Sequence, residues 1–330
     1  MKPIETSFTK LLNIKYPIIG APMFLVSNED MVVNTSEAGA IGAFPALNYR
    51  PIENYKKALE NIKSRTKKSI CVNVIVNKSN TRQGEDLKIA LDLGVEMFIT
   101  SLGTPKDVIK DAHKNGAKVF SDVTNLEHAL KVQDLGADGV IAVGSGAGGH
   151  AGPISPVVLI PWLKEKLKIP IIAAGGVATG SGMAAMLALG ADGVSVGTKF
   201  ITSKEAKVDQ NYKKAILDST PEDIVLNSRI SGTPANVINT DYVKKMGAEL
   251  PFLVEILKKH PLTKKFVVPL VHLAGMKTLE NAANKPTWKT VWGAGQGVGL
   301  IHEILSCEEI VHQLVNEYYE SLKGMPGYGS

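Results

Sequence analysis

The sequence predicts an α/β fold: a (β/α)8 TIM barrel with a C-terminal, mainly helical, lid-like subdomain. A repeated segment is the first observation behind this prediction. Leu135–Val140 (Leu-Gly-Ala-Asp-Gly-Val) recurs unchanged as Leu189–Val194, and weaker copies follow other helical patterns. In each copy a glycine, which suits the left-handed residue that closes a helix, precedes a short apolar run. Such runs, without polar alternation, are typical of parallel strands that are buried on both faces.

The second observation is that the apolar runs, each read as a strand, give eight strands at similar spacing. The predicted strands are Pro17–Ala21, Ile41–Phe44, Ile70–Val76, Met97–Ser101, Lys118–Asp122, Gly139–Val143, Pro170–Ala174 and Gly193–Gly197. Amphipathic stretches such as Ile52–Lys63, Leu126–Leu135 and Gly182–Leu189 lie between them and predict helices. Alternating strands and helices form a parallel sheet, and eight short units favour closure into a barrel over an open doubly wound sheet.

The chain that follows the eighth strand is longer than one barrel helix requires. We expect residues 1–204 to form the barrel, 205–290 a lid or substrate subdomain, and 291–330 a segment that returns to the barrel. Helical segments are predicted near Lys213–Ser219 and Pro251–Lys259, and a final helix over Ile301–Leu322.

Composition narrows the class of protein. The 330 residues are 44% hydrophobic and 21% charged, as in an ordinary globular protein, and contain no apolar run long enough to span a membrane. The first residues lack the apolar stretch of a secretory signal, so we expect a cytoplasmic protein. A net charge of +5 on scattered lysines predicts no nucleic-acid partner, and two isolated cysteines, Cys71 and Cys307, predict no metal site.

Glycines after the last two strands predict a phosphate site. Gly175 and Gly176 follow the seventh strand, and Gly197 and Thr198 follow the eighth. In a TIM barrel these two loops form the usual phosphate cradle, because glycines let backbone N–H groups approach the phosphate oxygens.

The loop after the sixth strand, residues 144–153, is rich in glycine and contains His150. It matches the G-x-G-x-x-G pattern, but Pro153 and Pro156 follow where a dinucleotide site needs a helix, so we reject that interpretation. The glycines instead indicate a loop that lies close to a flat ligand. An imidazole exchanges protons near neutral pH, and His150 is therefore the candidate catalytic residue.

Polar residues at other strand ends complete the predicted site. Asn73 lies within the third strand, and its amide could bind a flavin's pyrimidine edge or form a hydrogen bond inside the barrel. Asp122 closes the fifth strand, and it could accept a hydrogen bond from a ribityl hydroxyl or cap the helix that begins near Asn125.

Five motifs, taken in this order and spacing, resemble the nitronate monooxygenase family, formerly called 2-nitropropane dioxygenases. The motifs are Pro17–Met23, Ala147–His150, Ala173–Val177, Val196–Phe200 and Trp292–Gly297. The wider superfamily also contains flavin-dependent enoyl-ACP reductases and NAD(P)H:quinone reductases.

The resemblance implies a TIM barrel with non-covalently bound FMN and His150 as the catalytic base. The glycines after the seventh and eighth strands would hold the FMN phosphate. The residues that the resemblance places along the ring, its edge or the phosphate are Ala21, Pro22, Met23, Asn73, Gly148, Ser195, Val196, Gly197 and Thr198, and we add Gln296 from the last motif.

The sequence departs from the family's pattern in two places. Gly146 and Val143 stand where the family often carries Glu and Gln, and Thr233 and Asn236 stand where it usually carries arginines. These departures leave the flavin motifs intact, and they leave the substrate open.

The sequence therefore predicts FMN-dependent oxidation of alkyl nitronates by O2 to a carbonyl compound and nitrite. The alternative is an NAD(P)H-dependent flavin reductase of an enoyl-ACP or quinone, and a third hypothesis is a non-enzymatic barrel that binds a phosphorylated ligand. The expected partners are a nitronate or nitroalkane and O2, with NAD(P)H and a second copy of the chain, in a homodimer, as further candidates.

Overall fold

The computed structural model describes residues 1–77, 80–229, 233–247 and 291–324. Eight parallel strands close into a barrel in the order β1-β2-β3-β4-β5-β6-β8-β9, which confirms the predicted fold class. The strands are β1 (Ile18–Gly20), β2 (Ile41–Pro45), β3 (Ile70–Ile75), β4 (Met97–Ser101), β5 (Lys118–Val123), β6 (Gly139–Val143), β8 (Ile171–Ala174) and β9 (Gly193–Val196). Each differs from its predicted bounds by one residue at most at either end.

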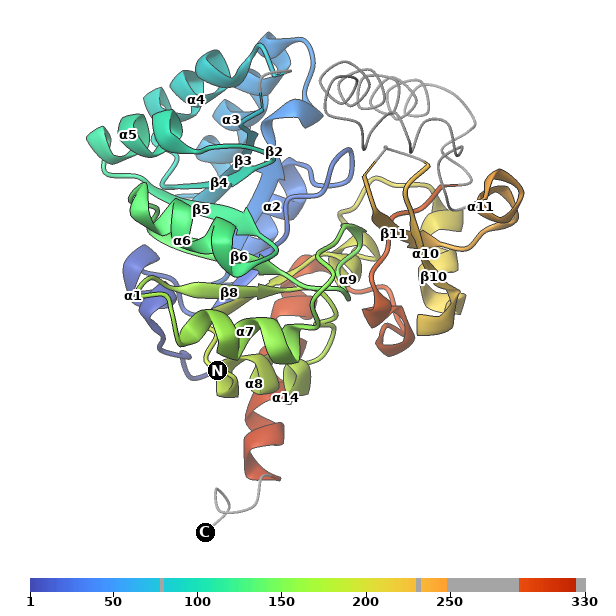
Figure 1. Ribbon diagram of the computed structural model, residues 1–330. Helices are drawn as coiled ribbons and strands as arrows, with labels where there is room; N and C mark the ends of the chain where they lie inside the picture. The colour runs from blue at the N-terminus through green and yellow to red at the C-terminus, as the bar shows by residue number, and fades with distance from the viewer. Residues whose placement is uncertain (78–79, 230–232, 248–290, 325–330) are drawn as a thin grey trace, which may run out of the picture.

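Helices cover the outside of the barrel (Figure 1). They are α2 (Glu29–Glu37), α3 (Ile52–Arg65), α4 (Gln83–Asp92), α5 (Lys106–Lys114), α6 (Leu126–Asp134), α7 (Pro156–Lys164), α8 (Gly180–Ala188) and the short α9 (Thr198–Ile201). Helix α1 (Ser7–Leu12) precedes β1, the 3-10 turn η1 (Ala46–Asn48) follows β2, and the last helix is α14 (Cys307–Lys323). Among the described residues, no helix is long and apolar enough to cross a membrane.

The repeated Leu-Gly-Ala-Asp-Gly-Val segment has a structural explanation. Gly136 and Gly190 close their helices with φ angles of 91° and 103°, which favour glycine. The aspartate two residues later accepts a hydrogen bond from the neighbouring strand: Asp138 Oδ2 from Val119 N at 2.8 Å, and Asp192 Oδ2 from Ile171 N at 3.0 Å. The repeat therefore fixes both the end of a helix and the start of the next strand pair.

Two layers of apolar side chains form the core. The inner layer fills the barrel and is closed at the strand N-termini by α1, whose Phe8 ring meets Phe120 edge-on at 5.5 Å. Gly139 leaves room for the Phe120 ring, which a Cβ at that position would overlap. The outer layer lies between the strands and the surrounding helices. Because the inner layer fills the bottom, the open end of the barrel is the end where the strands finish.

The chain after β9 folds beside this open end, to the right of the barrel in Figure 1. It contains α10 (Gln210–Asp218), η2 (Pro221–Asp223), β10 (Ile224–Asn227), β11 (Ala235–Ile238), α11 (Asp241–Met246) and η4 (Gln296–Leu300). Strands β10 and β11 form a three-stranded antiparallel sheet with β7 (Gly149–His150), which the sequence analysis did not predict. The lid boundaries of 205–290 stay a prediction, and the predicted helix Pro251–Lys259 lies outside the described residues.

The last helix begins later than predicted. It starts at Cys307 rather than Ile301 because Ser306 caps it: the Ser306 side chain accepts from Glu309 N, and Glu309 Oε2 accepts from Ser306 N. The apolar residue Ile301 belongs to the extended segment after η4, where it is buried against the barrel. Its apolar character misled the prediction, because burial of a single residue occurs in extended chain as well.

Helix α14 packs directly against α8 at Gly180 (Figure 1). Gly180 N donates to Glu317 Oε2 at 2.6 Å, so a carboxylate of α14 satisfies the N-terminus of α8. A Cβ on Gly180 would overlap the backbone of Leu314 and Tyr318. The C-terminal helix is therefore fastened to the barrel by a contact that only glycine permits.

We predict that Gly180→Ala lowers the free energy of unfolding by about 1–3 kcal/mol, because α14 must move to admit one methyl group. Chemical denaturation monitored by circular dichroism measures this change. Gly84→Ala in α4 is the matched control, since no atom lies within 4 Å of the added Cβ, and there the stability should stay equal or rise slightly. Equal stabilities for the two variants would contradict the packing described.

Candidate active site

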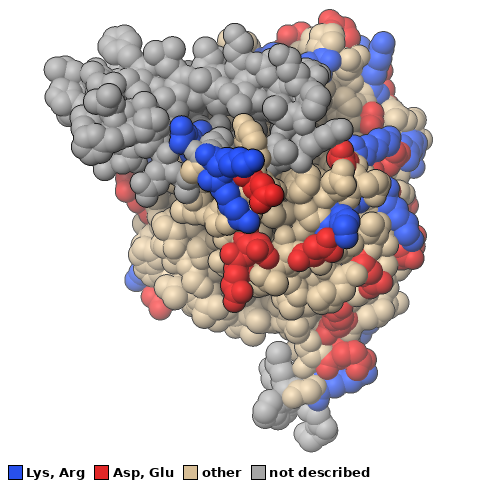
Figure 2. Space-filling model, turned by 90° about the vertical axis from the view of Figure 1, so that its right-hand side faces the viewer, with Lys and Arg blue, Asp and Glu red and all other residues tan. Residues whose placement is uncertain are grey.

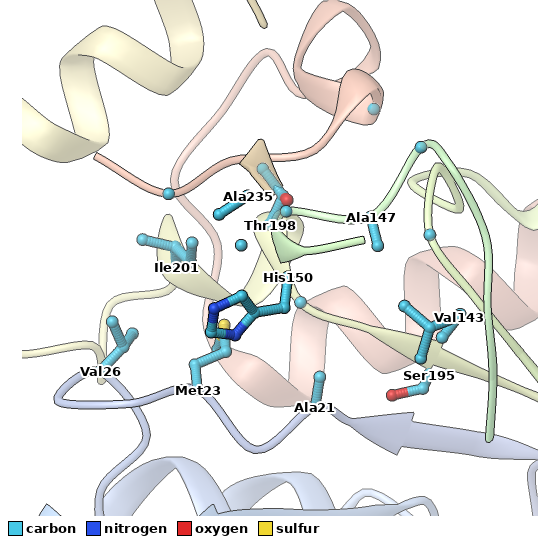
Figure 3. A pocket seen from close by; sticks show the side chains of 18 of the residues that line it. Ala21, Met23, Val26, Val143, Ala147, His150, Ser195, Thr198, Ile201 and Ala235 are labelled. Atoms are coloured by element: carbon cyan, nitrogen blue, oxygen red, sulfur yellow. The ribbon is translucent and has the colours of Figure 1, made fainter. Parts of the chain in front are cut away.

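A cavity of about 400 Å³ lies at the open end of the barrel (Figure 3). Its walls come from the end of β5, from the ends of β6, β8 and β9 and the loops that follow them, from the loop after β1, and from the chain after β9. The lining residues include Ala21, Pro22, Met23, Phe24, Val26, Asp122, Ile141, Val143, Gly146, Gly148, His150, Ala174, Gly175, Gly176, Ser195, Gly197, Thr198, Ile201, Tyr212, Ala235, Val237, Val291 and Gly293. A cavity at the carboxyl ends of barrel strands is where TIM-barrel enzymes carry out their chemistry.

Most of the predicted site residues meet there. Ala21, Pro22, Met23, Asp122, Gly148, Gly175, Gly176, Ser195, Gly197 and Thr198 line the cavity together with His150, whereas Asn73, Val196 and Gln296 do not. Val196 is buried inside β9, and Gln296 is exposed and contributes its backbone N–H to the loop after β6. For all of these residues, inside and outside the lining, cofactor contact stays a prediction.

The loops after β8 and β9 form the glycine-rich side of the cavity. Gly175 and Gly176 have φ angles of 108° and 81°, so both have backbone conformations that favour glycine. A Cβ on Gly175 would lie 2.6 Å from Ala147 N, whereas no atom lies within 4 Å of the Cβ position of Gly176, which faces the cavity. Thr198 opens the short helix α9 beside them, and its Oγ1 accepts from Gly295 N at 3.0 Å. Such a glycine cradle suits a phosphate group.

His150 lies on β7, and its imidazole ring projects into the open space of the cavity (Figure 3). Strand β7 pairs with β11, so that Ala235 lies opposite His150 and Asn236 opposite Gly149. The position of His150 is thus set by a strand pair that joins the barrel to the chain after β9.

A hydrogen-bonded chain runs across three strand ends. Asn73 Nδ2 donates to Ser101 Oγ at 2.7 Å and to Ile99 O at 3.1 Å, and Ser101 Oγ donates to Asp122 Oδ2 at 2.5 Å. The barrel-internal hydrogen bond that we considered for Asn73 is therefore present. Asn125, not Asp122, caps α6, because the Asn125 side chain accepts from His128 N. Of the two interpretations of Asp122, helix capping is wrong.

The Asp122 side chain lies near the end of β5 and is exposed to the open space of the cavity. The surrounding protein atoms desolvate the carboxyl group and so disfavour its charged form, which raises the pKa of Asp122 to about 6. The hydrogen bond from Ser101 opposes this shift. Asp122 is the only acidic lining residue, and no Lys or Arg lines the cavity, in the part of the chain that the structure describes.

Apolar side chains close the outer part of the cavity. Val26, Ile201, Val237 and Val291 come from four separate segments, and Figure 3 shows Val26 and Ile201 on one side of the His150 ring. Tyr212 of α10 stacks on Trp292 with ring centroids 5.7 Å apart, and its hydroxyl donates to Gly293 O. Sequence analysis missed Tyr212, because its place on an amphipathic helix gives no signal beyond core packing.

Comparisons with known proteins find relatives that match nearly the whole chain. The chain is 29% identical to a 5-hydroxy-7a-methyl-1-oxo-octahydro-1H-indene-4-carboxyl-CoA dehydrogenase of Rhodococcus jostii, over 96% of each chain. The structure matches FabK from Thermotoga maritima with a TM-score of 0.83 and 29% identity, over 98% of this chain and 99% of that one. It matches nitroalkane oxidase from Streptomyces ansochromogenes with a TM-score of 0.80 and 25% identity, over 96% and 99%.

The fold, the cavity and these relatives define the protein as an FMN-dependent oxidoreductase on a TIM barrel. The sequence profile described as nitronate monooxygenase matches residues 5–317, so the chain belongs to the nitronate monooxygenase family. The family predicted from the five motifs is confirmed.

The proposal that the Asp122 carboxylate accepts a hydrogen bond from a ribityl hydroxyl predicts a pH-dependent FMN affinity. The carboxylate prevails above pH about 6, and protonation below that pH weakens the acceptor, so affinity should fall as the pH drops from 7 to 5. Quenching of FMN fluorescence by the apoprotein measures the dissociation constant at each pH.

Asp122→Asn is the control, because the FMN phosphate also titrates near pH 6 and does so equally in both proteins. The ratio of the two dissociation constants should change across pH 6. A ratio that stays constant from pH 5 to 7.5 would remove Asp122 from the cofactor site.

Proposed function

We propose that the protein oxidises alkyl nitronates with O2, using bound FMN, to a carbonyl compound and nitrite. The observation that carries the proposal is His150: an imidazole projects into an apolar cavity at the strand ends of a chain that belongs to the nitronate monooxygenase family.

The residues of the cavity fit FMN. Gly176, Gly197 and Thr198 offer a glycine cradle for the phosphate, and the space beyond Gly176 is free of protein atoms within 4 Å of its Cβ position. Ile141, Val143 and Ala174 provide an apolar surface at the ends of β6 and β8 for a flat ring. When bound, FMN would accept electrons from the substrate, and O2 would reoxidise it.

This chain's own residues bind and orient the substrate. The apolar side chains Val26, Ile201 and Val237 hold the alkyl group and exclude water from the reacting carbon. His150 removes the α-proton when the substrate is a neutral nitroalkane, and the resulting imidazolium offsets the negative charge of the nitronate. This charge balance matters because no Lys or Arg lines the described cavity.

A second candidate is a flavin-dependent reductase or dehydrogenase of a thioester or quinone that uses NAD(P)H. Its support is the 29% identical relative that is named as a carboxyl-CoA dehydrogenase. Gly146 and Val143, both at the cavity, also stand where the nitronate monooxygenase pattern often has polar residues. The two candidates share the barrel and FMN and differ in the electron donor.

For the first candidate, His150→Ala should lower kcat for a neutral nitroalkane by about 100- to 10,000-fold, because the general base is lost. The preformed nitronate needs no α-proton removed, so its turnover should fall much less. Oxygen consumption and nitrite release measure both rates, and the absorbance of bound flavin shows that the cofactor is retained.

The matched control is His128→Ala, which removes an exposed imidazole on α6 that does not line the cavity. It should leave both rates unchanged. Wild-type turnover of nitroalkane by the His150 variant would exclude His150 as the base, and wild-type protein that releases no nitrite from either substrate would exclude the function.

A further inference from the structure

The loop that carries His150 is held by one buried side chain from the neighbouring sheet. Asn236 of β11 donates from Nδ2 to Ser145 O at 2.9 Å and to Ala147 O at 2.7 Å. Asn236 is only 6% exposed, so water does not substitute easily for these two hydrogen bonds.

The chemistry of an amide side chain fits this position closely. A primary amide nitrogen has two hydrogens, and both are donated to carbonyl oxygens of the same loop, on either side of Gly146. Because a carbonyl can only accept, the Nδ2 atom, and not Oδ1, must face the loop. An aspartate has nearly the same shape but would turn an acceptor toward both carbonyls.

Backbone contacts hold the same loop from two further directions. Gln296 N donates to Gly146 O at 3.1 Å, so three consecutive carbonyls, at residues 145, 146 and 147, each accept from the chain after β9. One residue along β11, Ala235 pairs with His150 itself. In these contacts Gln296 and Ala235 supply backbone groups, whereas Asn236 supplies its side chain, which a substitution can remove.

We propose that Asn236 is a positioning residue for His150. By fixing residues 145–147 it holds the adjoining Gly149–His150 strand at the depth where the imidazole reaches the substrate's α-carbon; this role rests on the proposed function. Proton transfer requires the base within hydrogen-bond reach of the proton, so a small displacement of the loop costs rate rather than substrate affinity.

The test compares Asn236→Asp and Asn236→Ala with Asn227→Ala. Asn227 is a buried asparagine of the adjacent strand β10 whose Nδ2 donates to Gly247 O, away from the His150 loop. It therefore reports what loss of a buried amide does to the sheet in general. Each variant is assayed as the flavin-loaded protein, by hydrogen–deuterium exchange over residues 144–152 and by turnover of nitroethane and of preformed ethylnitronate.

We expect both Asn236 variants to exchange amide hydrogens at least tenfold faster over 144–152, and Asn227→Ala to match the wild type there. We expect kcat for nitroethane to fall at least tenfold, with KM within threefold, and kcat for ethylnitronate to fall much less. Asn236→Asp should be no better than Asn236→Ala, because the donor and not the shape is what matters.

Unchanged exchange over 144–152 overturns the proposal, whatever the enzyme's activity. Faster exchange with equal losses on both substrates also overturns it, since Asn236 would then serve stability alone. If wild-type protein turns over neither substrate, the proposed function fails, and the exchange comparison alone decides whether Asn236 holds the loop.

Discussion

Close contact between backbones at the open end of the barrel is the constraint on which the site depends. The loop after β6 lies between the loop after β8 and the segment at 293–297, and at the closest approaches there is no room for a Cβ on the glycines. A Cβ on Gly175 would lie 2.6 Å from Ala147 N, and one on Gly148 would lie 2.7 Å from Gly295 N. These glycines let three segments, far apart in sequence, meet and place His150 at the cavity.

The same constraint divides the cavity into two chemical environments. Where backbones meet, N–H groups and the Thr198 hydroxyl give a polar side that suits a phosphate. Where side chains are admitted, they are apolar, as at Val26, Ile201 and Val237, and suit an alkyl group. The polar side chains His150, Ser195 and Asp122 are the exceptions, and the pKa of Asp122 is raised because surrounding protein atoms desolvate its carboxyl group. Figure 2 shows Lys, Arg, Asp and Glu on the outer surface of the molecule, whereas the cavity lining contains no Lys or Arg among the described residues.

The barrel could be predicted from the sequence because its units carry local signals: an apolar strand, a helix and, in several units, a closing glycine, with an aspartate two residues on in the two clearest copies, at Asp138 and Asp192. The phosphate loops and His150 could be predicted because their place follows from the fold, at the carboxyl ends of strands.

Features that depend on contacts between distant segments could not be predicted. Strands β10 and β11 are four residues each, and β11 is fixed by pairing with Gly149–His150, about 85 residues earlier. Tyr212 and Asn236 acquire their roles only through that packing. For Asn73, the sequence shows a polar side chain within a strand but does not identify its partners. Its hydrogen bonds to Ile99 and Ser101 follow from the register between strands.

We propose that a nitronate, and not a nicotinamide, delivers electrons to the flavin of this protein. The visible spectrum of the purified protein, recorded without oxygen while NADPH, NADH or ethylnitronate is added, tests this claim most directly. The account predicts a yellow protein that stays oxidised with both nicotinamides and loses its flavin absorbance with ethylnitronate. Rapid bleaching by NADPH or NADH, with no response to ethylnitronate, would contradict it.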